Sequence, residues 1–165
     1  MEKITSRLFM WLFFFSLLIA AGCQSTTGFY LGARADDETI VSLGTEVQEK
    51  LHWQDLYVKL DYTVQRQAQI LLFAGDFSFA DYPQGSLVRV VDFKLKLFLL
   101  DENQLVVDYF EIYRSLGGRL DEEMKFSKTL SLPAGTAAFA FGYEGRFVDE
   151  EGARETAWKL PKKSF

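Results

Sequence analysis

Residues 87–113 read LVRVVDFKLKLFLLDENQLVVDYFEIY and contain two apolar runs separated by the polar segment 101–104. In the first run a large apolar side chain occupies every second position, namely Val91, Phe93, Leu95, Leu97 and Leu99. The positions between them include the charged residues Asp92, Lys94 and Lys96. This alternation is typical of a β-strand with one buried face. The second run is rich in β-branched and aromatic residues, so the stretch predicts a β-hairpin.

The apolar pattern predicts a register for this hairpin, centred between Glu102 and Asn103. The expected pairs are Leu99–Val106, Leu95–Phe110 and Phe93–Ile112 on the apolar face, and Lys94–Glu111 on the polar face. Opposite charges in a cross-strand pair contribute about 0.2–1 kcal/mol. Asp108 falls opposite Leu97 on the apolar face. There we expect a β-bulge or a position at the rim, and a buried functional acid is the alternative.

The same register defines a candidate binding face on the side away from the core. It places Tyr109 beside Lys96 and Tyr113 beside Asp92. A tyrosine ring supplies contact area, while its hydroxyl or a neighbouring charge supplies direction. The alternative interpretation is that another element covers this face and the tyrosines serve packing alone.

Strand patterns continue on both sides of the hairpin. The segments are 56–65, 68–80, 87–100, 105–113, 126–132, 136–148 and 154–160, and turn-forming sequences separate them. Seven or so short strands predict an all-β fold, an antiparallel β-sandwich of immunoglobulin-like architecture. A barrel-like closure is the alternative.

The segment 136–148 has one face of large side chains and one of small side chains. The large ones are Phe139, Phe141, Tyr143 and Phe147, and the small ones are Ala138, Ala140 and Gly142. We expect the large face to point to the core. The small face suits close coverage, either by another part of the chain such as residues 29–53 or by a partner protein.

Residues 29–53 are interpreted as an N-terminal extension before a sandwich domain of residues 54–165. Apolar residues spaced for one face of a helix are Ile40, Leu43, Val47 and Leu51, preceded by Asp36 and Asp37. This spacing predicts a helix, and coil with a short strand at 39–42 is the alternative. The one histidine, His52, is expected to be a surface or structural residue.

The first 23 residues have the composition of an export signal. Lys3 and Arg7 precede a run of fourteen residues, 8–21, in which Ser16 is the only polar residue. A membrane-spanning helix needs about 20 apolar residues, so this run suits a signal peptide better. It closes with Ile19-Ala20-Ala21-Gly22-Cys23, which resembles the lipobox of bacterial lipoproteins.

The resemblance implies cleavage before Cys23 and diacylation of its thiol. Residues 1–22 would then be a lipoprotein signal peptide and 23–28 a lipidated tether. Gln24 after the cysteine implies the outer membrane on its periplasmic side, or the cell membrane where a cell has one membrane. Two alternatives stay open: an ordinary signal-peptidase site at residues 20–22, and an uncleaved helix.

Charge and residue types limit the classes of function that the sequence supports. The chain has 18 basic and 23 acidic side chains, and removal of residues 1–22 leaves 16 and 22, a net charge of −6. This argues against nucleic acid as a partner. One histidine and one cysteine give no evident metal set, no cofactor motif and no nucleophile with its base.

We therefore expect a non-catalytic envelope lipoprotein, not an enzyme, with a binding or assembly module. Its partners would be the membrane, through the lipid, and an envelope protein that the sequence does not identify. The alternative is an envelope glycan hydrolase or a carbohydrate-binding module.

Overall fold

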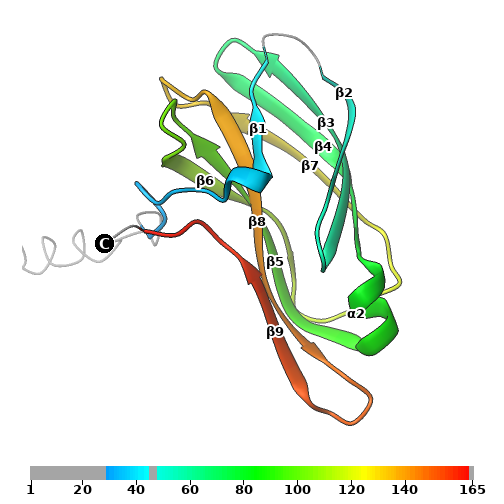
Figure 1. Ribbon diagram of the computed structural model, residues 1–165. Helices are drawn as coiled ribbons and strands as arrows, with labels where there is room; N and C mark the ends of the chain where they lie inside the picture. The colour runs from blue at the N-terminus through cyan, green and yellow to red at the C-terminus, as the bar shows by residue number, and fades with distance from the viewer. Residues whose placement is uncertain (1–28, 45–47, 164–165) are drawn as a thin grey trace, which may run out of the picture.

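The computed structural model describes residues 29–44 and 48–163, which form two β-sheets (Figure 1). The strands are β1 (Ile40–Ser42), β2 (Gln48–Gln54), β3 (Val58–Gln67), β4 (Ile70–Phe79), β5 (Arg89–Leu100), β6 (Val106–Ser115), β7 (Met124–Ser131), β8 (Ala138–Val148) and β9 (Arg154–Lys159). Two short helical segments accompany them, the 3₁₀ turn η2 (Asp37–Thr39) and the helix α2 (Asp81–Ser86). Within these described ranges, no helix is long and apolar enough to cross a bilayer.

Every strand pair is antiparallel. One sheet has the order β1-β8-β5-β6, with β9 also paired to β8, and the other has the order β2-β3-β4-β7. The chain passes between the sheets after β1, through α2, after β6 and after β7 (Figure 1). The prediction of an all-β antiparallel sandwich is confirmed.

Aromatic side chains from both sheets form the core. Those fully buried between the sheets are Phe73, Phe77 and Phe79 of β4, Phe93 of β5, and Phe139, Phe141 and Phe147 of β8. They lie at every second position of their strands, as the period of a strand requires. Phe77 stacks on Phe93 across the sheets with ring centroids 5.6 Å apart. Aromatic pairs contribute about 0.5–1.5 kcal/mol beyond their buried area, so they fix how the sheets face each other.

The β5–β6 hairpin forms, but the predicted register is wrong. The backbone N–H of Asp101 donates to the carbonyl of Leu105 (3.0 Å), which leaves a three-residue loop, 102–104. The last loop residue, Gln104, has a φ of 65°. A three-residue loop ending in a left-handed residue is a common hairpin connection that carries a bulge. The turn is therefore centred later than the apolar pattern suggested.

Bulges in β6 shift the pairing further. The observed pairs include Leu100–Val106, Leu99–Asp108, Lys96–Glu111, Leu95–Tyr113 and Lys94–Arg114. Asp108 borders the first irregularity, and its carboxylate accepts the N–H of Tyr109 (2.8 Å). The expectation of a bulge at Asp108 is confirmed. Each bulge adds one residue to one strand, which a period-two pattern does not reveal.

The described part of the segment 29–53 contains no long helix, so that prediction is wrong. The carboxylate of Asp36 accepts the N–H of Glu38 (3.3 Å) and caps the single turn η2. β1 follows directly, which confirms the alternative of a short strand near 39–42. β1 pairs with β8 and β2 pairs with β3, so this segment contributes to both sheets.

Residues 29–36, here called the strap, cross the outer face of the five-stranded sheet. Its buried residues are Tyr30, Ala33 and Ala35. They cover a second apolar cluster made of Phe98, Leu100, Val106, Ala138 and Ala140. The small side chains of β8 let the strap lie close to the sheet. Coverage of this face by the same chain is confirmed.

Gly142 in β8 leaves no room for a side chain, which gives a first prediction. A Cβ there would lie 2.5 Å from the carbonyl oxygen of Lys159 and 2.7 Å from a ring carbon of Phe98. We expect Gly142→Ala to lower the free energy of unfolding by about 1–3 kcal/mol, because overpacking displaces backbone. Urea unfolding measures the change.

The matched control is Gly85→Ala in α2, where a Cβ meets open space. It should leave the free energy of unfolding unchanged or raise it slightly, because alanine favours a helix over glycine. Equal losses in both variants would contradict the close contact at Gly142.

Candidate binding cleft

The strap is the first part of the chain that the structure describes, and it pairs with residues 160–163, here called the C-terminal segment. Arg34 forms antiparallel bridges with both Leu105 and Lys162. The N–H of Arg34 donates to the carbonyl of Lys162 and the N–H of Lys162 donates to the carbonyl of Arg34, each at 2.9 Å. On the other side the N–H of Val106 donates to the carbonyl of Ala33 (2.9 Å). The strap therefore lies between the start of β6 and the C-terminal segment.

The edge of β8 that faces away from β5 is left without a strand partner at two positions. β1 pairs with residues 138–140 of β8, and β9 pairs with residues 143–148, so Phe141 and Gly142 lie between the two neighbours. Pro161 has no N–H to continue the ladder on β8. The chain beyond β9 turns to the strap instead, where Lys162 pairs with Arg34.

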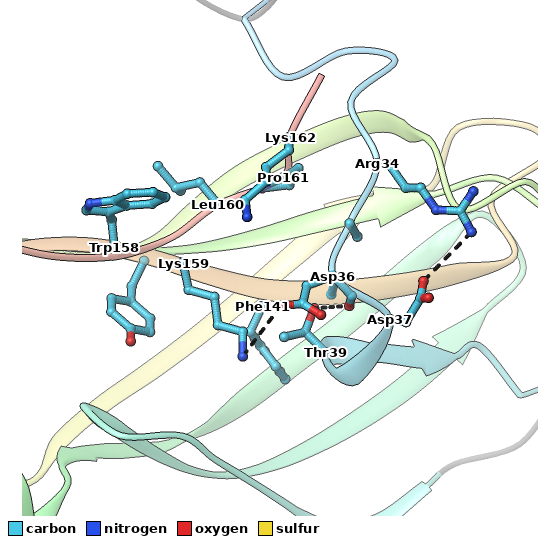
Figure 2. Close-up of a pocket in the computed structure, with 13 residues that line it drawn as sticks. Arg34, Asp36, Asp37, Thr39, Phe141, Trp158, Lys159, Leu160, Pro161 and Lys162 are labelled. Atoms are coloured by element: carbon cyan, nitrogen blue, oxygen red, sulfur yellow. Dashed lines mark hydrogen bonds and ion pairs between the residues drawn. The ribbon is translucent and has the colours of Figure 1, made fainter. Parts of the chain in front are cut away.

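At this gap in the pairing of β8 lies a cleft of about 600 Å³ between the strap, β8 and the C-terminal segment (Figure 2). Its lining residues are Arg34, Ala35, Asp36, Asp37, Thr39, Ala140, Phe141, Tyr143, Trp158, Lys159, Leu160, Pro161 and Lys162. The volume lies within the range of small-molecule and peptide-side-chain pockets. Trp158, 61% exposed, is the large aromatic residue that the cleft presents to solvent.

Tyr143 belongs to the rigid lining of the cleft. Burial raises its pKa far above the ordinary range, and its hydroxyl donates to the carboxylate of Asp55 (2.7 Å), which raises the pKa further. The same carboxylate accepts the N–H groups of Tyr57 and Val58 at 2.9 Å. Tyr143 therefore connects β8 to the β2–β3 turn and stays protonated.

Charges of both signs line the cleft in loose pairs. Arg34 lies 3.8 Å from Asp37, and Lys159 lies 3.9 Å from Asp36. The guanidinium of Arg34 also donates to the side chain of Gln104 (2.7 Å). Solvent-exposed ion pairs contribute at most about 1 kcal/mol. A ligand with its own charged groups can therefore replace these partners at small cost.

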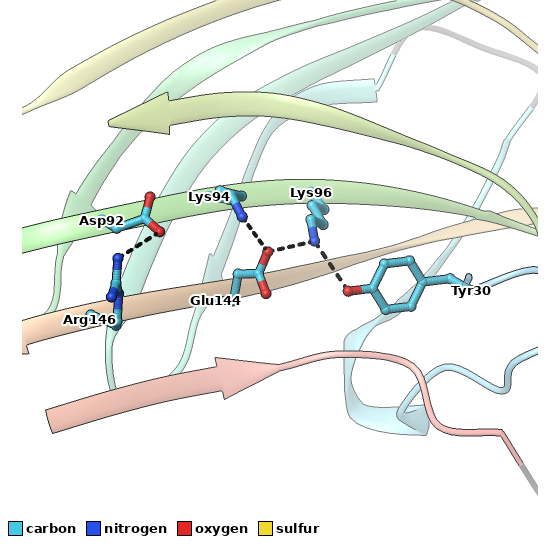
Figure 3. A network of polar contacts seen from close by, with 6 residues as sticks. All are labelled: Tyr30, Asp92, Lys94, Lys96, Glu144 and Arg146. Carbon is cyan, nitrogen blue, oxygen red and sulfur yellow. Dashed lines mark hydrogen bonds and ion pairs between the residues drawn. The ribbon is translucent and has the colours of Figure 1, made fainter. Parts of the chain in front are cut away.

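Beside the strap lies a polar network with Lys96 at its centre (Figure 3). Lys96 is only 7% exposed, and its ammonium donates to the hydroxyl of Tyr30 (3.2 Å) and to Glu144 (2.9 Å). Lys94 donates to the same oxygen of Glu144 (3.0 Å). The ammonium of Lys96 also lies 4.9 Å from the centre of the Tyr30 ring. The network holds the strap at Tyr30.

Opposing effects set the pKa values in this network. Burial lowers the pKa of Lys96, but its hydrogen bonds to Glu144 and Tyr30 and the charge of Glu144 raise it overall. Burial raises the pKa of Glu144, but hydrogen bonds and charges from Lys96 and Lys94 outweigh burial and lower it. Both groups are therefore held in their charged forms at neutral pH.

The structure does not bring the four residues of the sequence-predicted binding face together. Tyr113 points to the core, with its ring centroid 4.5 Å from that of Phe77. Tyr109 packs under the strap, 5.0 Å from the ring of Tyr30. Lys96 is buried, and Asp92 lies 3.6 Å from Arg146. The shifted register separates the tyrosines, so the predicted pairing of Tyr109 with Lys96 and of Tyr113 with Asp92 is wrong.

Sequence reasoning missed the cleft because its walls come from three distant segments. The available signal was Pro161 directly after an alternating strand, which marks where a ladder must stop. Cys23 and the lipobox-like segment 19–23 lie outside the described residues.

A second hollow of about 740 Å³ lies on the outer face of the four-stranded sheet. Its carboxylates already have close basic partners: Asp61 contacts His52 (3.1 Å) and Lys50 (3.7 Å), and Asp76 contacts Lys125 (3.9 Å). In the part of the chain that the structure describes, no group of three or more His, Cys, Asp or Glu residues is placed to hold a metal ion.

Comparison of the chain with family models, curated proteins and solved structures finds no match.

The lowered pKa of Glu144 predicts an acid-dependent loss of stability. Because the folded pKa lies below the ordinary value of 4.5, the pairing of Glu144 stabilises the fold above about pH 4.5 and loses this effect as the pH falls below it. We expect Glu144→Gln to cost about 0.5–1 kcal/mol at pH 7, since the carboxylate is partly exposed.

Urea unfolding at pH 7 and pH 3.5 measures this effect. The variant should lose less stability between the two pH values than the unmodified protein. Glu150→Gln, on the exposed turn before β9, is the control and should behave as the unmodified protein does. An unchanged pH dependence in Glu144→Gln would contradict the assignment.

Proposed function

We propose that this protein is an exported lipoprotein of the cell envelope, anchored through Cys23, whose β-sandwich is a non-catalytic binding or assembly module for another envelope protein. One observation carries the proposal: the cleft is built from the strap, and the strap begins only a few residues after the lipobox-like Ile19-Ala20-Ala21-Gly22-Cys23. The binding surface is thereby held close to the anchor.

The strand order supports an immunoglobulin-like arrangement as part of this proposal. β3, β4 and β7 correspond in order to strands A, B and E, and β6, β5, β8 and β9 to C′, C, F and G. β1 and β2 are additions at the sheet edges. Folds of this architecture serve many functions, so the cleft rather than the fold supports binding.

The chemistry of the cleft suits a protein segment that carries charged and apolar side chains together. Trp and Arg are enriched where protein interfaces bind most strongly, and the cleft offers Trp158 and Arg34. Asp36 and Asp37 supply acceptors for basic groups of a partner. We place the module on the periplasmic side of the outer membrane, or on the outer side of the membrane in a cell with one membrane.

The anchor is tested by Cys23→Ala. Loss of the thiol should abolish metabolic labelling with palmitate. It should also release the domain from membranes, because the chain that remains after signal cleavage carries no acyl group. Membrane fractions and labelled gels measure both. Membrane association of an unlabelled, signal-cleaved chain would contradict the anchor.

The cleft is tested by in vivo photo-crosslinking from position 158, followed by mass spectrometry. We expect one dominant envelope protein to be captured, because Trp158 is exposed at the cleft. The control position is Ile70, which is exposed on the four-stranded sheet and should capture nothing specific. Trp158→Ala should leave thermal stability nearly unchanged. The same products from both positions would contradict a partner in the cleft.

Binding of envelope glycan is a second candidate for the same cleft. The exposed indole of Trp158 beside the carboxylates of Asp36 and Asp37 favours it, since a flat ring and hydrogen-bond acceptors suit a sugar. Cosedimentation with purified peptidoglycan tests binding, and release of reducing ends tests hydrolysis.

A further inference from the structure

We propose that the end of the sandwich formed by the strap and the C-terminal segment rests on the lipid bilayer. Phe29 and Leu31 enter the headgroup region and Lys163 faces lipid phosphates, while Arg34 and Lys162 keep lining the cleft. This inference rests on the proposed anchor at Cys23, and it adds an orientation of the domain that the anchor alone does not provide.

The short reach of the chain after Cys23 keeps the strap close to the lipid. Phe29 is the sixth residue after Cys23, and a polypeptide spans at most about 3.6 Å per residue, so Phe29 lies within about 22 Å of Cys23 in any conformation. An acylated cysteine lies at the membrane surface. The headgroup layer adds about 5–8 Å on each side of the hydrocarbon core. The strap is therefore the part of the sandwich that is held nearest to the lipid.

Two apolar residues of the strap are exposed to solvent. Phe29 is 73% exposed and Leu31 is 43% exposed, whereas Tyr30 between them is buried against the sheet. The N–H of Ala33 donates to the carbonyl of Tyr30 (2.9 Å), and Gly32 has a φ of 72°. These values describe a tight turn with Leu31 at its tip. The two apolar side chains thus project from a fixed backbone.

Basic residues accompany the exposed apolar ones in sequence and in pairing. Arg34, three residues after Leu31, forms a backbone-bonded pair with Lys162, and the exposed Lys163 follows, so basic residues lie on both paired segments. Long basic side chains carry their charge to the headgroups while their stems lie along apolar surface. Aromatic and basic residues together are typical of segments that lie in the membrane interface.

Acidic residues limit this contact. Arg34 is paired with Asp37, and the chain after Cys23 is acidic overall. Electrostatic attraction would therefore not recruit a free domain to anionic lipid. The proposed anchor changes this, because a domain tethered to the membrane meets the lipid at a high effective concentration. A weak apolar contact is then sufficient to orient the domain.

In this orientation the two ends of β6 lie at different distances from the bilayer. Val106 bonds to the strap, and Ser115 lies nine residues further along the same strand, about 30 Å away. Leu116, 77% exposed, follows at the far end. It lies in the loop after β6 and serves as the internal reference for depth.

The test uses the acylated full chain in vesicles of phosphatidylethanolamine and phosphatidylglycerol. A nitroxide is attached at Leu31→Cys or, as the control, at Leu116→Cys, and its collisions with oxygen and with a soluble nickel chelate are compared. We expect a several-fold higher ratio of oxygen to nickel collisions at position 31 than at position 116. Equal ratios would overturn the inference.

A second pair of variants tests the insertion of Phe29. With the label at Lys163→Cys, Phe29→Asp should lower the oxygen-to-nickel ratio to that of position 116. Phe29 is exposed, so this change should not affect folding. An unchanged ratio would overturn the insertion. Shielding of positions 31 and 163 in cells but not in vesicles would assign these two residues to a protein contact and also overturn the inference.

The mass of the purified chain shows whether acyl groups are attached, and it therefore distinguishes failure of the bilayer contact from failure of the anchor. An acylated chain with an accessible label at position 31 overturns the bilayer contact and leaves the anchor standing. A chain purified from membranes without acyl groups overturns the anchor, and the contact with it.

Discussion

The burial of β5 and β8 on both faces is the constraint on which the rest of the structure depends. From Leu95 to Leu100 every residue of β5 is buried, because the side chains that point away from the core lie under the strap or, at Lys96, in its polar network. Without the strap, Phe98 and Leu100 would face water at a cost of about 1.5–3 kcal/mol for each large side chain. The strap is therefore part of the fold.

This coverage also creates the candidate site. The strap must cross to reach β1, and the C-terminal segment leaves β8 at Pro161 and meets the strap at Arg34. The cleft is the space between the strap, β8 and the C-terminal segment. A packing requirement on one face thus brings the two ends of the described chain together, and the proposed partner site lies at the end of the sandwich nearest the proposed anchor.

Much of the fold was predictable because period-two alternation is local. The strand segments followed from the alternation of apolar and polar residues, and the two faces of β8 followed from side-chain size. Whether this chain or a partner protein covers the small face stayed open in the sequence. The register of β6 did not follow from a local pattern, because the positive φ of Gln104 and the extra residues near Asp108 and Ile112 are set by turn geometry and twist. β2 was missed because its apolar spacing also fits a helix, and pairing with β3 decides between them. The cleft depends on contacts between Arg34 and Lys162, which no local pattern contains.

Lys96 shows how a charge can specify the position of the strap. It lies where the half of β5 that the strap covers meets the half that carries Lys94 and Asp92. Burial of an ammonium group without a partner costs free energy. Tyr30 and Glu144 satisfy it together, one from the strap and one from β8. A strap displaced by one residue would move Tyr30 away and leave a buried donor unpaired. The apolar cluster supplies the affinity of the strap for the sheet, and Lys96 supplies its register.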